Sequence, residues 1–116
     1  MRPWTAPEKD RLASASSLRL SAGTPASQSV ELGMVLVDGE LYVRAFGGVT
    51  SRWFATAVQT GVGAIDVDGH RADVLLRPVT GDDDRIEAAY RRRYGASADL
   101  VATSAARAAT LLITAR

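Results

Sequence analysis

Residues 41–60 read LYVRAFGGVTSRWFATAVQT. Residues 41–46 are mostly β-branched, aromatic or aliphatic, and they predict a strand. The strand ends at Gly47-Gly48, and an amphipathic helix begins near Thr50 and is closed by Gly61. The apolar side chains of this helix share one side: Trp53, Phe54, Ala57 and Val58. This stretch therefore predicts a strand, a glycine turn and a helix that packs on a sheet.

The start of this helix is the strongest candidate for a binding site. A helix N-terminus presents unpaired backbone N–H groups and a partial positive charge, which together hold anions. The candidate ligand-binding residues are Gly47, Gly48, Ser51 and Trp53, with Arg44 or Arg52 as the counter-charge. The alternative is a purely structural turn, in which the glycines supply positive φ and the aromatic residues fill the core.

Arg44 is the more informative of the two arginines. It alternates with Tyr42 along the strand, so both side chains leave the same strand face. We expect that face to be either the exterior of a barrel or a dimer surface.

Length and composition restrict the class of protein. The 116 residues fit one domain over residues 1–116, and 47% hydrophobic with 23% charged residues is typical of a globular fold. The net charge of +1 argues against nucleic-acid binding. The absence of cysteine excludes disulfides, zinc thiolate sites and thiol nucleophiles. Residues 1–10 are too polar for a secretory signal, and no apolar run could cross a bilayer, so we expect a cytoplasmic protein with no membrane contact.

Two Asp-Gly pairs predict tight hairpins of type I′. Asp38-Gly39 separates strands expected at 28–37 and 41–46, and Asp68-Gly69 separates strands expected at 62–67 and 71–79. Further strands are expected at 17–21 and 110–114, where apolar residues alternate or cluster.

Helices are marked by caps. Thr5 and Glu8 form a capping-box pattern, and Asp82–Asp84 begins a helix that Gly95 ends. In that helix Tyr90 and Tyr94 share one face, and we expect them in a core or an interface with their hydroxyls at the rim. The whole pattern predicts an α+β fold, a six-stranded antiparallel split β-barrel with two to three short helices, because barrel closure removes exposed strand edges.

The order of several short motifs resembles a known bacterial family. These motifs are GELYVR at 39–44, the pair Gly47-Gly48, the pair Trp53-Phe54, AAYR at 88–91, Tyr94-Gly95 and ARAATL at 106–111. Their order and spacing resemble domain of unknown function 2255 over most of the chain. This resemblance carries no function with it.

A more distant likeness is to the flavin- and deazaflavin-binding split-barrel reductases. It implies a six-stranded split barrel, a homodimer, and a cofactor such as FMN beside Gly47, Gly48, Ser51 and Trp53. The deazaflavin group has a basic phosphate turn between its first two strands, but residues 22–27 (AGTPAS) contain no Lys or Arg. The basic side chains that would bind a phosphate through charge-assisted hydrogen bonds are therefore missing from this turn, which argues against deazaflavin.

Other polar groups have simpler explanations. His70 follows a hairpin turn and has no evident catalytic partner. The hairpin turn places Asp66, Asp68 and His70 on different faces, so no metal site is predicted. The helix dipole accounts for Asp82–Asp84, and Arg91–Arg93 fan around a helix.

Two hypotheses follow for function. The first is a protein that binds an anionic or aromatic small molecule, with a flavin-type oxidoreductase as its specific form, in which the cofactor supplies the chemistry. The second is a non-catalytic dimeric module that acts through protein contacts or as an accessory factor.

Overall fold

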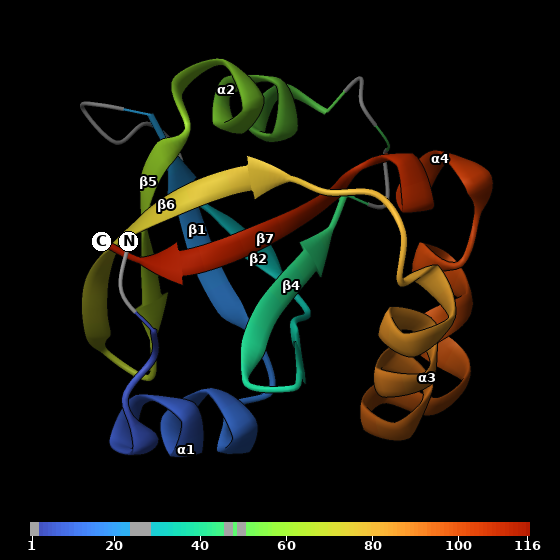
Figure 1. Cartoon of the computed structure of the whole chain (residues 1–116), viewed down its shortest axis with the longest axis horizontal. Helices are drawn as coiled ribbons and strands as arrows, with labels where there is room; N and C mark the ends of the chain where they lie inside the picture. The colour runs from blue at the N-terminus through green and yellow to red at the C-terminus, as the bar shows by residue number, and fades with distance from the viewer. Residues whose placement is uncertain (1–2, 24–28, 46–47, 49–50) are drawn as a thin grey trace.

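The computed structural model describes residues 3–23, 29–45, 48 and 51–116, and shows an α+β fold (Figure 1). The described helices are α1 (Ala6–Ser14), α2 (Arg52–Thr60), α3 (Asp83–Tyr94) and α4 (Ser104–Ala108), with the 3-10 segment η2 (Gly95–Val101) between the last two. The described strands are β1 (Leu18–Ala22), β2 (Val30–Leu32), β3 (Val35–Val37), β4 (Glu40–Arg44), β5 (Val62–Val67), β6 (His70–Pro78) and β7 (Thr110–Ala115).

All seven described strands form one antiparallel sheet in the order β2-β1-β5-β6-β7-β4-β3. The two edge strands, β2 and β3, are neighbours in the sequence and are separated only by Gly33 and Met34. So short a connection requires the sheet to curl until its edges approach each other. The result is a curled half-barrel, and we call the junction at Gly33 and Met34 the seam.

The expectation of six strands was wrong because the segment expected at 28–37 is two strands. β2 pairs with β1, where Leu18 lies opposite Leu32, and β3 pairs with β4, where Val35 lies opposite Tyr42. One straight strand cannot serve both edges of a curled sheet. The expected two to three helices were also too few, since four α-helices are described.

Both predicted hairpin turns are confirmed by their backbone conformation. Asp38 and Gly39 have φ of 53° and 79°, and Asp68 and Gly69 have φ of 50° and 80°. Positive φ at both central residues is the requirement of a type I′ turn, whose twist matches that of the flanking strands. The turns join β3 to β4 and β5 to β6.

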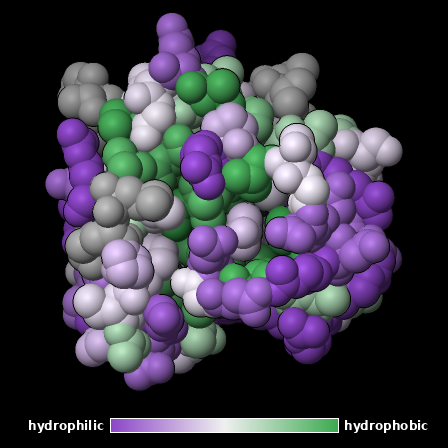
Figure 2. Space-filling model, viewed as in Figure 1, coloured by the Kyte–Doolittle hydropathy of each residue, from purple (hydrophilic) through white to green (hydrophobic). Residues whose placement is uncertain are grey.

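Two hydrophobic layers lie on opposite sides of the sheet. Leu41 and Val43 point into the barrel core, while Tyr42, between them, packs beneath α3 with Leu112. Alternate side chains of β4 therefore pack on both faces of the sheet, because α3 covers the outer face. Figure 2 shows a mostly hydrophilic surface over α3 and hydrophobic residues in the middle of the face, over β6 and β7.

The ends of the half-barrel are covered by helices, with α1 below and α2 above in Figure 1. The capping box of α1 is present, since the Glu8 amide donates to Thr5 and the Thr5 amide donates to Glu8. Just before α1, the Trp4 indole donates to the Ile113 carbonyl at 3.1 Å, which ties the start of the described chain to β7. None of the described helices has the length and hydrophobicity needed to span a bilayer.

Candidate functional site

Arg44 extends from the outer face of β4 and is fully buried beneath α3, with its side chain 0% exposed. Its Nε donates to Thr110 Oγ1 at 3.1 Å, and Nη1 donates to the Val101 carbonyl at 3.0 Å. Nη2 donates to Asp83 Oδ1 at 3.0 Å, and Nη1 also lies 3.4 Å from Glu87 Oε1. A buried cation is tolerated only when it is paired and hydrogen-bonded, and this one is both.

The partners of Arg44 extend into a four-residue network. Glu87 also accepts from Arg107, so two arginines and two carboxylates meet at the start of α3. Asp83 thus does more than interact with the helix dipole, which was the sequence interpretation. The charge of Arg44 is balanced inside the fold, between β4, α3 and β7.

The other predicted site residues lie at the start of α2. Gly48 has φ of 74°, and a Cβ there would lie 3.2 Å from Ala105 Cβ. Ser51 is the N-cap without a side-chain cap bond, Arg52 is exposed, and Trp53 packs edge-on against Phe54 with ring centroids 6.0 Å apart. Gly47 lies outside the described residues, so the anion site at this helix end stays a prediction.

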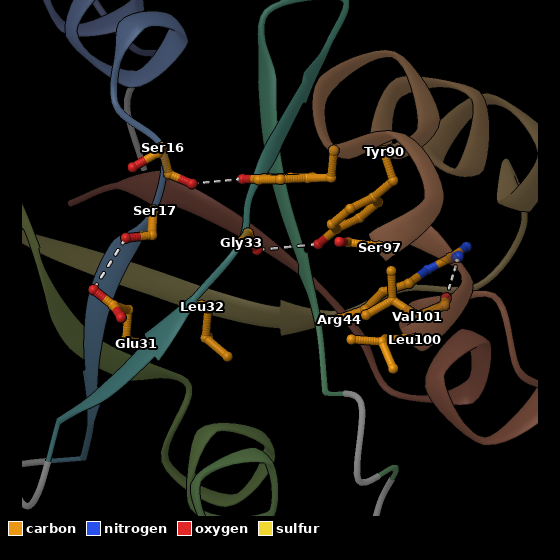
Figure 3. A pocket seen from close by; sticks show the side chains of 11 residues that line it. Ser16, Ser17, Glu31, Leu32, Gly33, Arg44, Tyr90, Ser97, Leu100 and Val101 are labelled. Carbon is orange, nitrogen blue, oxygen red and sulfur yellow. Dashed lines mark hydrogen bonds between the residues drawn. The ribbon is translucent and has the colours of Figure 1, made fainter.

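A hollow of about 330 Å³ lies at the seam, between the end of β2 and the α3–η2 corner (Figure 3). We call it the seam pocket. It is lined by Ser16, Ser17, Glu31, Leu32, Gly33, Arg44, Tyr90, Tyr94, Ser97, Leu100 and Val101. Arg44 is the member of the predicted site that reaches it.

Two tyrosines of α3 fix the backbone of this pocket. Tyr90 donates to the Gly33 carbonyl at 3.2 Å, and burial raises the pKa of Tyr90 above its ordinary value. Tyr94 Oη accepts from the Met34 amide at 2.9 Å and lies within donating distance of the Ser16 and Met34 carbonyls. A Cβ at Gly33 would lie 3.1 Å from Tyr94 Cζ, so glycine lets the ring pack directly on the chain.

The rest of the lining is apolar on one side and polar at the rim. Leu32 and Leu100 face the hollow from opposite sides in Figure 3, and Leu100 is 60% exposed. At the rim Ser17 donates to Glu31 at 3.2 Å. The sequence had no signal for Glu31, Leu32 or Leu100, because only the curling of the sheet brings β2 beside η2.

A family model described as an uncharacterized protein conserved in bacteria (DUF2255) matches residues 9–113 of the chain. The chain belongs to the DUF2255 family. This confirms the resemblance inferred from the motif order. No curated protein sequence matches this DUF2255 chain.

Solved structures share the fold of this DUF2255 protein at low sequence identity. The conserved hypothetical protein Rv2991 from Mycobacterium tuberculosis has a TM-score of 0.69 and 14% identity, covering 100% of this chain and 82% of that one. HutZ, a heme storage protein from Vibrio cholerae, has a TM-score of 0.64 and 12% identity, covering 99% and 90%. A heme-binding protein from Mycobacterium smegmatis has a TM-score of 0.63 and 14% identity, and this chain spans 52% of its length.

Proposed function

We propose that this DUF2255 protein binds a small, largely apolar molecule in the seam pocket. The observation that carries the proposal is the wall formed by Leu100, which is 60% exposed at the edge of a hollow of about 330 Å³. Small-molecule sites are concave, mostly apolar and largely pre-formed, and this hollow lies at the lower end of their usual size. The tyrosine hydrogen bonds to Gly33 and Met34 supply the pre-formed frame.

The polar groups restrict the charge of the ligand. Arg44 reaches the pocket, but its guanidinium is already bound to Asp83, Glu87, Thr110 and Val101. The rim carries the Glu31 carboxylate, which repels anions and accepts hydrogen bonds. The pocket therefore favours a neutral ligand, or one that presents a hydrogen-bond donor at the rim.

Two of these structural neighbours are named for heme, so we ask whether the seam pocket could hold heme. Heme iron needs an axial His, Cys, Met or Tyr ligand. Among the described lining residues only Tyr90 and Tyr94 are of these types, and their hydroxyls are bonded to the seam backbone. The raised pKa of Tyr90 also opposes the tyrosinate form. The seam pocket does not fit heme.

A flavin phosphate does not fit this pocket either, because an anion would meet Glu31 and find the Arg44 guanidinium already paired. The flavin-type oxidoreductase form of the hypothesis therefore depends on the start of α2, with Gly47, Gly48, Ser51, Arg52 and Trp53. That site, the homodimer, the cytoplasmic location and a single domain over residues 1–116 stay proposals. Light scattering of the purified protein tests the homodimer.

The seam pocket is tested with the neutral fluorescent probe N-phenylnaphthylamine. We expect the probe to bind the native protein, and Leu100→Asp to weaken binding by about tenfold through lost apolar contact and added charge. Val58→Asp is the matched control, because Val58 is 46% exposed on α2 and lines no part of the seam pocket. No binding, or equal weakening by both variants, would overturn the proposal and favour the non-catalytic module.

A further inference from the structure

A second hollow, of about 370 Å³, lies where α1 covers the open end of the half-barrel beside the β5–β6 turn. We call it the end pocket. It is lined by Trp4, Glu8, Arg11, Leu12, Ile65, Val67, Gly69, His70, Arg71 and Ala72. It shares no lining residue with the seam pocket. In Figure 1 α1 and the turn that joins β5 to β6 both lie at the lower left.

The floor of the end pocket is apolar and rigid. Trp4, Leu12, Ile65 and Val67 belong to the barrel core, and each is at most 6% exposed. The Trp4 indole N–H is fixed by the Ile113 carbonyl, so the flat ring is held in place. Such a floor suits the body of an aromatic or aliphatic molecule.

The strand register directs His70 toward this floor. His70 lies opposite Val67, and Ala72 lies opposite Ile65, so these four residues share the inner face of the hairpin. His70 Nδ1 lies 3.2 Å from the Asp68 carbonyl oxygen. A carbonyl only accepts, so Nδ1 is the donor there, which leaves Nε2 of the neutral imidazole as a hydrogen-bond acceptor. Arg71 lies opposite Asp66 on the other face and contributes only to the rim.

Arg11 brings a cation to the same space from α1. Within the described part of the chain its guanidinium has neither a hydrogen-bond nor a salt-bridge partner, although the side chain is half-buried. Glu8, the acidic residue of the lining, accepts the Thr5 amide at 2.8 Å in the capping box and keeps its negative charge. Arg71 adds a second cation to the lining, so two guanidinium groups outweigh one carboxylate, unlike in the seam pocket. The end pocket thus combines a guanidinium that has no partner among the described residues with an apolar floor.

We propose that the end pocket binds a small amphiphilic anion. Its apolar body lies on Trp4 and Ile65, and its carboxylate or phosphate is held by Arg11. A planar guanidinium suits both anions, since it can donate two parallel hydrogen bonds to either. This ligand class is anionic, whereas the seam pocket favours a neutral ligand, so the two proposals are tested independently.

Tryptophan fluorescence titrations with three matched naphthalene compounds test the proposal. Naphthoate and naphthyl phosphate carry the two candidate anions, and naphthylmethanol is the uncharged analogue. We expect at least one anion to bind about tenfold more tightly than naphthylmethanol. The tighter of the two anions shows whether the end pocket prefers a carboxylate or a phosphate. Arg11→Gln should abolish that preference. Arg92→Gln, on the exposed face of α3, removes the same charge and should change affinity less than about twofold.

Three results would overturn the proposal. One is equal binding of all three compounds, and another is equal loss in the Arg11→Gln and Arg92→Gln variants. The third is loss of anion binding in Arg52→Gln but not in Arg11→Gln, which would move the anion to the start of α2. Failure of N-phenylnaphthylamine to bind would contradict the seam-pocket proposal and leave this one intact.

Discussion

The Tyr94 hydroxyl on α3 accepts a hydrogen bond from the Met34 amide at 2.9 Å, 60 positions earlier in the chain. Met34 lies between the two edge strands of the curled sheet, so one phenol holds the seam to the helix outside it. The seam backbone has to leave both strand ladders to turn, and Tyr94 and Tyr90 satisfy the groups that this turn releases.

Tyr94→Phe should lower the free energy of unfolding by about 1 to 3 kcal/mol, because it leaves the Met34 amide without its partner. Urea unfolding followed by circular dichroism measures this change. Tyr90→Phe is the control, since it removes a donor only from the Gly33 carbonyl, and a carbonyl tolerates this better than an amide does. An unchanged midpoint for Tyr94→Phe would show that the hydroxyl does not hold the seam.

Arg44→Met should cost about 1 to 3 kcal/mol, because it leaves the Asp83 carboxylate and the Val101 carbonyl without their donor. Arg85→Met is the exposed comparison, since Arg85 and its partner Asp38 are 52% and 74% exposed. That pair should contribute about 1 kcal/mol or less. Equal unfolding midpoints for the two variants would contradict a structural role for the buried guanidinium.

Acid should weaken the fold through Glu87. The hydrogen bond from Arg107 lowers the pKa of Glu87 below its ordinary value of 4.5. A carboxyl with a lowered folded-state pKa contributes stability that is fully present above its unfolded pKa and is lost as pH falls through the folded value.

The stability difference between the native protein and Glu87→Gln should therefore be constant above pH 4.5 and shrink below it. Unfolding curves collected over a range of pH measure the difference. Asp84→Asn, on the exposed side of α3, removes the same charge from the helix and is the control for a change in net charge. A stability difference that increases as the pH falls below 4.5 would contradict this role of Glu87.

Gly63→Ala should destabilise the sheet by about 2 kcal/mol or more, because a Cβ there would lie 2.5 Å from the Ser21 carbonyl oxygen of the paired strand. Gly69→Ala places a Cβ in open space at φ of 80° and should cost about 1 kcal/mol. Thermal unfolding compares the two variants. A smaller loss of Tm for Gly63→Ala than for Gly69→Ala would show that β1 and β5 can separate without cost.

The local elements follow from the sequence because their causes lie within a few residues. Asp38-Gly39 and Asp68-Gly69 specify type I′ turns through backbone conformation alone, and Thr5 and Glu8 cap α1 across three positions. Gly61 and Gly95 end α2 and α3 because each adopts a positive φ. The antiparallel α+β class and the family membership could also be predicted from the sequence.

The division at Gly33 depends on tertiary structure. Residues 28–37 form a continuous strand pattern, and nothing local indicates that one half pairs with β1 and the other with β4. At the point of division Tyr94 packs directly on Gly33 and accepts from the Met34 amide, and both contacts come from a residue 60 positions beyond Met34.

The sequence by itself determined the turns, the caps, the alternation along β4 and the charge that Arg44 carries. Only the tertiary structure decided which groups pair with that charge, since Asp83 and Glu87 lie 39 and 43 positions further along the chain. The seam pocket and the end pocket are likewise products of curling, which brings β2 beside η2 and α1 beside the β5–β6 turn. Turn and cap energies act over a few bonds, whereas ion pairing and cavity formation depend on which distant surfaces exclude water together.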